Sequence, residues 1–289
     1  MSELVLTFLK PGLLTSIQDN GRTGHQAFGV PVGGALDKTS ARAANRILGL
    51  NDSHPVLEIT LLGPEIHFST AAEVAITGAD FPVKLNGSAV AFYERILVPA
   101  NSILNFGHVT NGCRAYMSIA ADWQVEQWLG SVSSLGMGSN ILADNIISRK
   151  QQLVKLKTLS VTHTTAAKVA TIKLNPMKSV RLHKGPEFDY LGKAAIASLF
   201  GNGHKISRQA SRMGYQLETI LPVIAENMEI ISSGILPGTV QVTPAGHPII
   251  LLADAQTTGG YPRVASIIEA DLDVIAQLKP GDEVWFDIY

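Results

Sequence analysis

The stretch "AEVAITGADFPVKLNGSAV", residues 72–90, decides the fold class of this chain. Short apolar and β-branched runs within it are separated by Pro82 and by the pair Asn86-Gly87. An Asn-Gly pair supplies the two positive φ values that a type I′ turn needs, so this pair predicts a tight hairpin. The whole stretch is therefore typical of a strand, a bend, a second strand, a turn and a third strand.

Strand patterns continue beyond this stretch, and helical patterns are few. "ERILVPANSILNF" (94–106) and "RAYMSIA" (114–120) carry apolar residues between turn residues, as strands do. Helices are predicted only at 37–50, 185–201 and 270–278, where apolar residues follow a start signal or precede a stop signal. We therefore predict a mainly β chain with a few short helices, built from two barrels or sandwiches and not from a doubly wound α/β sheet.

The length of 289 residues is enough for two domains with a core each. Residues 147–179 are polar and rich in Thr and Lys, which is typical of edge strands leading into a connection between domains. We place the boundary near residue 170, with a first domain at 1–170 and a second at 171–289.

Composition and charge exclude several classes of protein. A net charge of −1 provides no basic surface for nucleic acid or for an anionic membrane. Cys113 is the only cysteine, so no intrachain disulfide can form, and no run of eighteen apolar residues or N-terminal signal pattern is present. These features predict a cytoplasmic protein without a nucleic-acid or membrane partner.

Common cofactor motifs are also missing from the sequence. "GPEFDYLGKA" (185–194) has the wrong spacing for a phosphate-binding Walker loop, and the eight His residues show no metal-ligand spacing. "NPMKSV" (175–180) offers Lys178 with a Met on one side only, whereas a biotin carrier presents Lys between two Met. We therefore predict no metal site and no covalently bound biotin on this chain.

The stretch "DAQTTGGYPR", residues 254–263, contains more functional groups than a hairpin turn requires. Its two glycines allow the backbone to approach a ligand closely, and successive N–H groups there can bind an anion. Thr257 and Thr258 add hydroxyls, Asp254 adds an acceptor or base, and Gln256 adds an amide. A plain turn is the alternative, but we favour a binding site because functional groups concentrate on loops held by a rigid scaffold.

Two arginines in turn-rich segments are candidate anion ligands. Arg22 lies in "IQDNGRTGHQAFGV" (17–30), and Arg212 precedes Met213 and Gly214. A guanidinium binds carboxylate or phosphate through two parallel hydrogen bonds. The alternatives are a loop in which Arg22 binds a nearby Asp, and a surface position for Arg212.

Several stretches occur in an order that resembles a known family. They are "IQDNGRTG" (17–24), "LEITLLGPEI" (57–66), "ITGAD" (76–80), "SRMGYQL" (211–217), "EIISSGILPGTVQV" (229–242), "PIILLADAQTTGGYP" (248–262) and "DLDVIAQLKPGDEVWF" (271–286). Together they resemble the KipA family, also called allophanate hydrolase subunit 2 or biotin-dependent carboxyltransferase-like, which includes the C subunit of prokaryotic ATP-dependent 5-oxoprolinase. This resemblance implies two cyclophilin-like β-barrel domains.

The resemblance also implies a function and partners. It implies an ATP-dependent amide hydrolase subunit, active in complex with a KipI-type B subunit and an A subunit, that opens the lactam of 5-oxoproline to glutamate. ATP would be bound with Mg²⁺ in that complex. Two alternatives stay open: the carboxyltransferase subunit of a biotin-dependent urea or amide carboxylase, and a non-catalytic KipA-type regulator that binds a KipI-like kinase inhibitor.

Under this resemblance we expect a set of site residues on both domains. The expected catalytic residues are Asp254, Thr258 and Arg212. The expected substrate-binding residues are Gln241, Gln256, Thr257, Gly259, Gly260, Tyr261, Asp19, Arg22, Asp37 and Asn45. The chain departs from the family pattern at Ala120-Ala121, where a Gly pair is common, so the second half carries the stronger match.

Overall fold

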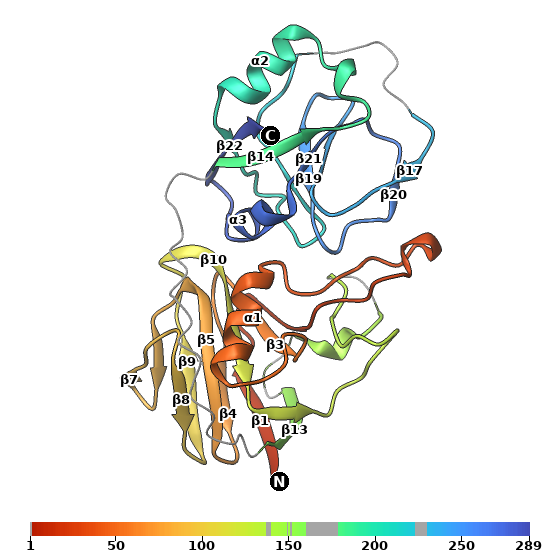
Figure 1. The fold of residues 1–289 in the computed structure, drawn as a ribbon. Helices are drawn as coiled ribbons and strands as arrows, with labels where there is room; N and C mark the ends of the chain where they lie inside the picture. Colours follow the sequence, from red (N-terminus) through yellow and green to blue (C-terminus); the bar gives the residue numbers. More distant parts are fainter. Residues whose placement is uncertain (1, 137–139, 149, 151, 160–178, 223–229) are drawn as a thin grey trace. The chain divides into compact units, whose positions relative to one another are not determined.

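The computed structural model describes residues 2–136, 140–148, 150, 152–159, 179–222 and 230–289 (Figure 1). The chain forms two compact units: Met1–Arg22 with Gly33–Leu174, and Thr23–Val32 with Asn175–Tyr289. The boundary predicted near residue 170 lies outside the described residues. The prediction also placed residues 23–32 in the first domain, whereas the structure groups them with the second unit.

Two antiparallel sheets form most of the first unit. The order of the first sheet is β11 (Ala121–Trp123), β13 (Gln152–Thr158), β1 (Glu3–Lys10), β4 (Glu65–Phe68), β9 (Ser102–Phe106), β6 (Val83–Leu85) and β7 (Ser88–Ala89). The order of the second sheet is β12 (Ile146–Ile147), β2 (Leu14–Gln18), β3 (Val56–Thr60), β10 (Asn111–Ile119), β5 (Ala72–Asp80) and β8 (Arg95–Val98).

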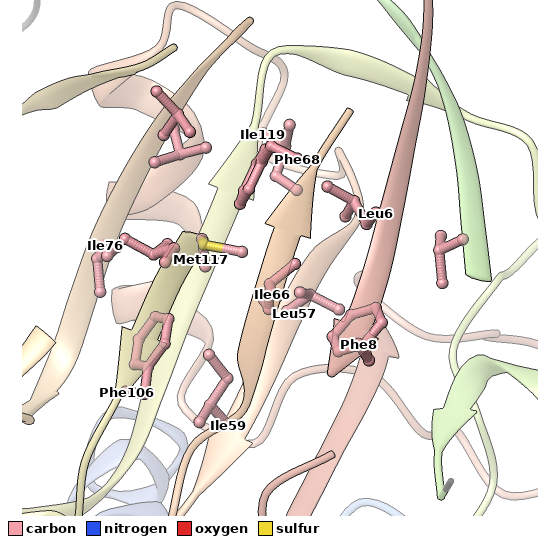
Figure 2. Close-up of a cluster of buried hydrophobic side chains, with 14 of the residues drawn as sticks. Leu6, Phe8, Leu57, Ile59, Ile66, Phe68, Ile76, Phe106, Met117 and Ile119 are labelled. Atoms are coloured by element: carbon pink, nitrogen blue, oxygen red, sulfur yellow. The ribbon is translucent and has the colours of Figure 1, made fainter. Parts of the chain in front are cut away.

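Both sheets contribute buried apolar side chains to one core, shown in Figure 2. Leu6 and Phe8 come from the first sheet, and Leu57, Ile76 and Met117 from the second, and all five are fully buried. Burial of such side chains stabilises the fold by about 1.5–3 kcal/mol each. This core explains why the alternating stretches of the sequence become strands of facing sheets.

The stretch that predicted the fold class forms β5, β6 and β7. Leu85 pairs with Ser88 across the turn, and Asn86 and Gly87 have φ values of 49° and 87°. Positive φ at both central positions is the signature of the type I′ hairpin. The predicted hairpin is therefore confirmed.

Helix α1 (Lys38–Ile47) covers the face of the second sheet that points away from the core. Asp37 caps it, because its side chain accepts a hydrogen bond from the backbone N–H of Ser40 over 2.8 Å. Strand β10 alternates, so Met117 points into the core while Tyr116 and Ser118 lie on the helix side. The helix predicted at 37–50 is confirmed with slightly shorter bounds.

A seven-stranded sheet forms the frame of the second unit. Its order is β15 (His204–Lys205), β22 (Glu283–Ile288), β14 (Ser179–Lys184), β21 (Arg263–Ile267), β18 (Thr239–Val242), β19 (Pro248–Leu251) and β16 (Gly214–Gln216). A bridge between Ile206 and Leu217 joins its first and last strands, and the N–H of Ser207 donates to the carbonyl of Gln216 over 2.9 Å. These contacts close the sheet on itself. A separate small sheet pairs β17 (Ser233–Gly234) with β20 (Thr258–Gly259).

Two α-helices complete the described part of the second unit, α2 (Lys193–Gly201) and α3 (Leu272–Ala276). The helix predicted from residue 185 begins later, at Lys193, because the preceding residues are bound to β21. The N–H of Gly185 donates to the carbonyl of Val264 over 2.9 Å, and the carboxylate of Glu187 accepts from Arg263.

Short 3-10 turns occur at η1 (Gln26–Phe28), η2 (Ala143–Asn145), η3 (Phe188–Tyr190) and η4 (Glu269–Asp271). The prediction of a mainly β chain with a few short helices is confirmed. No helix among the described residues is both long enough and apolar enough to span a membrane.

Candidate functional site

The predicted site around "DAQTTGGYPR" lies on the connection between β19 and β21 in the second unit. In its middle, β20 is held by β17, with Thr258 opposite Gly234 and Gly259 opposite Ser233. The N–H of Ile235 donates to the carbonyl of Thr257 over 2.9 Å. We name this connection, residues 252–262, the ribbon. Its backbone hydrogen bonds show that it is more than an unsupported turn.

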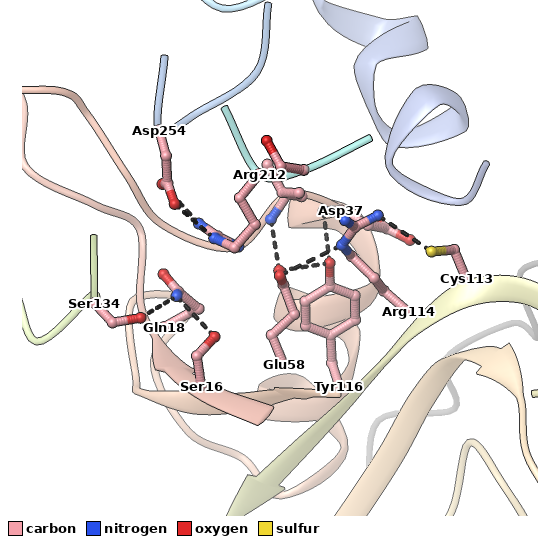
Figure 3. A network of polar contacts seen from close by, with 12 residues as sticks. Ser16, Gln18, Asp37, Glu58, Cys113, Arg114, Tyr116, Ser134, Arg212 and Asp254 are labelled. Atoms are coloured by element: carbon pink, nitrogen blue, oxygen red, sulfur yellow. Dashed lines mark hydrogen bonds and ion pairs between the residues drawn. The ribbon is translucent and has the colours of Figure 1, made fainter. Parts of the chain in front are cut away.

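At the start of this ribbon, Asp254 is paired with Arg212. Nε and Nη2 of Arg212 donate to the two carboxylate oxygens of Asp254 over 2.8 and 2.9 Å, as Figure 3 shows. Both side chains are almost fully buried, with exposed fractions of 4% and 1%. A buried bidentate pair fixes both loops, because separating the pair would leave two buried charges without a partner. The pair therefore holds the start of the ribbon to the loop that contains Arg212.

The glycines of the ribbon allow close packing behind it. A Cβ on Gly259 would lie 2.5 Å from Cδ1 of Ile235 and 3.2 Å from the side-chain amide nitrogen of Gln241, so a larger residue there would require these side chains to shift. That amide of Gln241, which is buried, donates to the carbonyl of Tyr261 over 3.0 Å. Gln241 therefore supports the ribbon from inside, and the carbonyl of Gly260 accepts from Ile230 over 3.3 Å.

Other predicted groups on the ribbon face solvent. Gln256 and Thr258 are exposed, Thr257 is half-buried, and 42% of Tyr261 is exposed. Gln256 and Thr257 line a small hollow together with Ala253, Ala255, Ile235, Leu236, Pro237, Gln26, Pro31 and Val32. The hollow measures about 10 Å³, which is close to the least space that one water molecule needs. The hollow is therefore too small to enclose a molecule of several atoms.

In the first unit, Asp19 organises the loop that follows β2. Its carboxylate accepts hydrogen bonds from the backbone N–H groups of Gly21 and Val132 over 2.7 and 2.9 Å. It also accepts from the hydroxyls of Ser131 and Ser133 over 2.6 and 2.5 Å. Asp19 thereby joins residues 19–21 to residues 131–133.

Arg22 is buried and reaches the same segment. Nη2 donates to the carbonyl of Ser133, Nε lies 3.4 Å from the carbonyl of Trp128, and the guanidinium carbon lies 5.4 Å from the centre of the Trp128 ring. Such contacts hold a guanidinium through hydrogen bonds and a cation–π interaction. Within the first unit, Arg22 therefore serves to tether its own loop.

Asp37 and Asn45 hold the two ends of α1. Asp37 is the cap described above, and its carboxylate also accepts from the hydroxyl of Ser40 over 2.6 Å. The amide of Asn45 donates to the carbonyl of His54 over 2.8 Å and accepts from the hydroxyl of Ser118 over 2.6 Å. Both side chains are buried, so these contacts give them structural roles within the first unit.

A buried polar group that includes Glu58, Tyr116 and Arg114 lies beside the N-terminal end of α1 (Figure 3). The hydroxyl of Tyr116 donates to Glu58 over 2.9 Å and accepts from the backbone N–H of Asp37 over 2.8 Å. Glu58 also accepts from the N–H of Leu36 over 2.9 Å and lies 3.5 Å from Nε of Arg114. Burial, with the nearby Glu58 and Asp37 carboxylates, raises the pKa of Tyr116 well above its ordinary value, so the phenol stays protonated and can donate.

Comparison with known proteins places the chain in a family. A model described as "Carboxyltransferase domain, subdomain A and B" matches residues 28–288, which is most of the chain. The chain belongs to the carboxyltransferase domain family.

The chain is also similar to named proteins and to solved structures. The chain is 33% identical to the C subunit of 5-oxoprolinase from Escherichia coli K12, over 98% of this chain and 90% of that protein. The crystal structure of Kluyveromyces lactis urea carboxylase matches with a TM-score of 0.87 and 29% identity, over 98% of this chain and 27% of the other. The crystal structure of TTHA0988 matches with a TM-score of 0.86 and 28% identity, over 98% of this chain and 56% of the other. This carboxyltransferase domain therefore spans about half of the TTHA0988 chain and about a quarter of the K. lactis chain.

Sequence reasoning missed several buried polar residues of this carboxyltransferase domain. Glu58 and Tyr116 were absent from the predicted set, although the alternation in "CRAYMSI" (113–119) placed Tyr116 on the face opposite Met117. Ser233 was also missed: its hydroxyl is buried opposite Gly259 and has no hydrogen-bond partner among the described residues. No sequence motif marks Ser233, and only its strand pairing brings it to the ribbon.

The exposed side chains of the ribbon are neutral and polar, so they suit the hydrogen-bonding groups of a substrate. Hydroxyls, primary amides and backbone N–H groups bind an amide or a phosphoryl oxygen through hydrogen bonds. Within the part of the chain that the structure describes, no cluster of three or more His, Cys, Asp or Glu side chains could hold a metal ion.

Proposed function

We propose that this chain is a subunit of an ATP-dependent 5-oxoprolinase, which opens the lactam of 5-oxoproline to glutamate while ATP is hydrolysed. The observation that carries the proposal is the 33% identity to the C subunit of E. coli 5-oxoprolinase, which extends over 98% of this chain and 90% of the relative. The match covers nearly the whole of both proteins, so the name refers to the whole region of the relative that this chain resembles.

The chemistry needs an activated amide. A lactam carbon is a poor electrophile, and ATP can activate it by transferring its γ-phosphoryl group to the amide oxygen, which releases ADP. Water then adds to the carbon, the C–N bond breaks to open the ring, and a second water hydrolyses the resulting acyl phosphate to glutamate and phosphate. Such a reaction depends on positioning and on stabilising charge at oxygen. In our proposal the N–H groups and hydroxyls around Thr257, Thr258, Gly259 and Gly260 bind that oxygen, and Gln256 orients the ring.

The ion pair limits what Asp254 does in this scheme. Both carboxylate oxygens of Asp254 accept a hydrogen bond from the buried guanidinium, so neither oxygen is left to exchange a proton with a substrate. We therefore propose that Asp254 and Arg212 position the ribbon, while Thr258 contacts the substrate.

A complex is part of the proposal, because the relative is named as one subunit of an enzyme. We propose that the rest of the enzyme consists of a KipI-type B subunit and an A subunit, and that ATP with Mg²⁺ binds in the assembled complex. Biotin is not expected on this chain, and Lys178, the one residue considered for it, lies outside the described residues.

Reconstitution tests this proposal. The chain is co-expressed with its B-type and A-type partners, and ATP hydrolysis and glutamate formation are measured with and without 5-oxoproline. We expect ATP hydrolysis that depends on 5-oxoproline and one glutamate formed per lactam opened. A stable complex that forms no glutamate would contradict the proposal.

A second function has support from the similarity to urea carboxylase, whose structure matches with a TM-score of 0.87. In that case the chain would transfer a carboxyl group from carboxybiotin, supplied by a separate carrier, to urea or another amide. Avidin distinguishes the two: it blocks a biotin-dependent carboxylation and leaves 5-oxoproline-dependent ATP hydrolysis unchanged.

A further inference from the structure

Residues 23–32, which we name the arm, belong to the second unit although the residues on both sides belong to the first. Before the arm, Asp19 and Arg22 are bound to residues 128–133. After the arm, the N–H groups of Leu36 and Asp37 donate to Glu58 and Tyr116. We name the segments on either side of the arm, residues 19–22 and 36–37, its bases. Both bases are held by hydrogen bonds within the first unit.

The arm gains little from its own burial. Its 3-10 turn at Gln26–Phe28 contains no buried residue, and 82% of Phe28 is exposed. Gly24 and Gly29 have φ values of 86° and 79°, and a Cβ added at either would meet no atom within 4 Å, so they shape the turn without packing. An exposed segment of this kind contributes little to stability and is typical of a segment kept for binding.

The bases of the arm, in contrast, contain buried charges, which lower stability unless they are hydrogen-bonded. Arg22, Asp37 and Glu58 are all buried, and a buried charge destabilises a protein unless it is fully hydrogen-bonded. Glu58 accepts from the N–H of Leu36 just after the arm, while Arg22 donates to the carbonyl of Ser133 and Asp37 accepts from the N–H of Ser40, all within the first unit. Fixing both bases in this way reduces the conformational entropy that the arm would lose on binding a ligand.

Gln26 is the arm residue with the chemistry for the site. It lines the same small hollow of the second unit as Gln256 and Thr257. A primary amide both donates and accepts hydrogen bonds. The lactam group of 5-oxoproline has one N–H donor and one carbonyl acceptor, so an amide side chain is complementary to it.

We propose that Gln26 binds the amide group of the substrate over the hollow that it shares with Gln256 and Thr257 in the second unit. This inference rests on the proposed function and adds to it a substrate-binding residue from a segment distant in sequence from the ribbon.

Steady-state kinetics of the reconstituted complex test the inference. We expect Gln26→Ala to raise the KM for 5-oxoproline about tenfold and to change kcat less than twofold, because a contact made to the bound substrate is lost. Gln26→Asn, which keeps the amide on a shorter side chain, should recover part of the loss. Thr23→Ala, an exposed arm residue that does not line the hollow, is the matched control and should match the wild type.

An active complex in which Gln26→Ala leaves KM within twofold of wild type would overturn the binding role. A wild-type complex without 5-oxoproline-dependent turnover would overturn the proposed function and this inference with it.

Discussion

In the second unit the guanidinium of Arg212 faces a carboxylate, whereas in the first unit that of Arg22 lies against backbone carbonyls and the ring of Trp128. Asp19, near Arg22 in sequence, gives its carboxylate to two N–H groups and two serine hydroxyls. Both arginines come from glycine-containing loops, both are buried, and both were expected to bind a substrate anion. They stabilise their loops by different means.

The difference shows which groups are left for a ligand. In both units the charged side chains hold backbone segments, while the exposed groups of the ribbon are neutral: Gln256, Thr258 and Tyr261. Hydrogen bonds from neutral groups bind an amide without the cost of stripping water from a charge. Buried charged side chains therefore hold the loops in place, and the exposed neutral side chains of the ribbon are left for a ligand.

The largest effect is expected from the ion pair. Arg212→Ala leaves Asp254 charged and buried, so we expect the free energy of unfolding to fall by about 3–5 kcal/mol, measured by chemical denaturation. Arg46→Ala, which breaks a pair with Asp52 at the surface, is the control and should cost about 0.5 kcal/mol.

A double-mutant cycle shows whether the two loops really differ. Arg212 and Asp254 should be coupled by about 2–3 kcal/mol, and Arg22 and Asp19, which share partners without pairing in this way, by less than about 1 kcal/mol. Equal coupling in both loops would break the comparison.

The next effect concerns Tyr116. Tyr116→Phe removes the acceptor of the Asp37 N–H and a donor to Glu58, both buried, so we expect a loss of about 1–3 kcal/mol in the free energy of unfolding. Tyr190→Phe removes an exposed hydroxyl and serves as the control. A loss for Tyr116→Phe no greater than that of the control would show that the polar group beside α1 does not stabilise the first unit.

Thr258 tests the neutral surface. Thr258→Ala should reduce turnover of the reconstituted complex more than tenfold, equivalent to about 1.4 kcal/mol, while the melting temperature stays within about 2 °C of wild type. Thr258→Ser keeps the hydroxyl and should retain most of the activity. Full activity of the alanine variant would move the site away from the ribbon.

The smallest expected effect is a pH dependence of stability that arises from buried His204 in the second unit and half-buried His54 in the first. Burial lowers the pKa of His204, which bonds Thr219 and the carbonyl of Leu199, and likewise lowers the pKa of His54 in the first unit. Above the ordinary pKa of about 6.5 both folded and unfolded forms are neutral. As the pH falls below that value the unfolded chain binds a proton that the folded chain does not, so stability decreases.

Denaturation at pH 7 and pH 5 measures this decrease. His204→Asn should make the decrease smaller, and replacement of the exposed His183 by Asn should leave it unchanged. An equal decrease in the His204 variant would remove His204 as its source.

The sequence predicts those features that depend on neighbours in the chain. The Asn86-Gly87 hairpin and the Asp37 cap require residues within a few positions, and both are found as predicted. The pairing of Arg212 with Asp254 joins residues 42 positions apart, and no local pattern encodes it. Glu58 and Tyr116 meet only because of the register between β3 and β10.

The site shows the same division. The ribbon was predicted because its functional groups follow one another in sequence. Ser233 and Gln26 were missed, because strand pairing and the membership of the arm in the second unit bring them to the ribbon. The roles of individual ribbon residues stay predictions until the variants above are measured.

The arm also affects the order in which the protein folds as it is synthesised. Residues 23–32 leave the ribosome long before residues 175–289, with which they form one unit. The second unit therefore cannot fold completely until its C-terminal strands have been made. Until then, residues 23–32 lack the rest of their unit. A recombinant fragment that starts at residue 175 would lack part of its own unit, so dissection of this protein requires a permuted or fused chain that restores the missing arm.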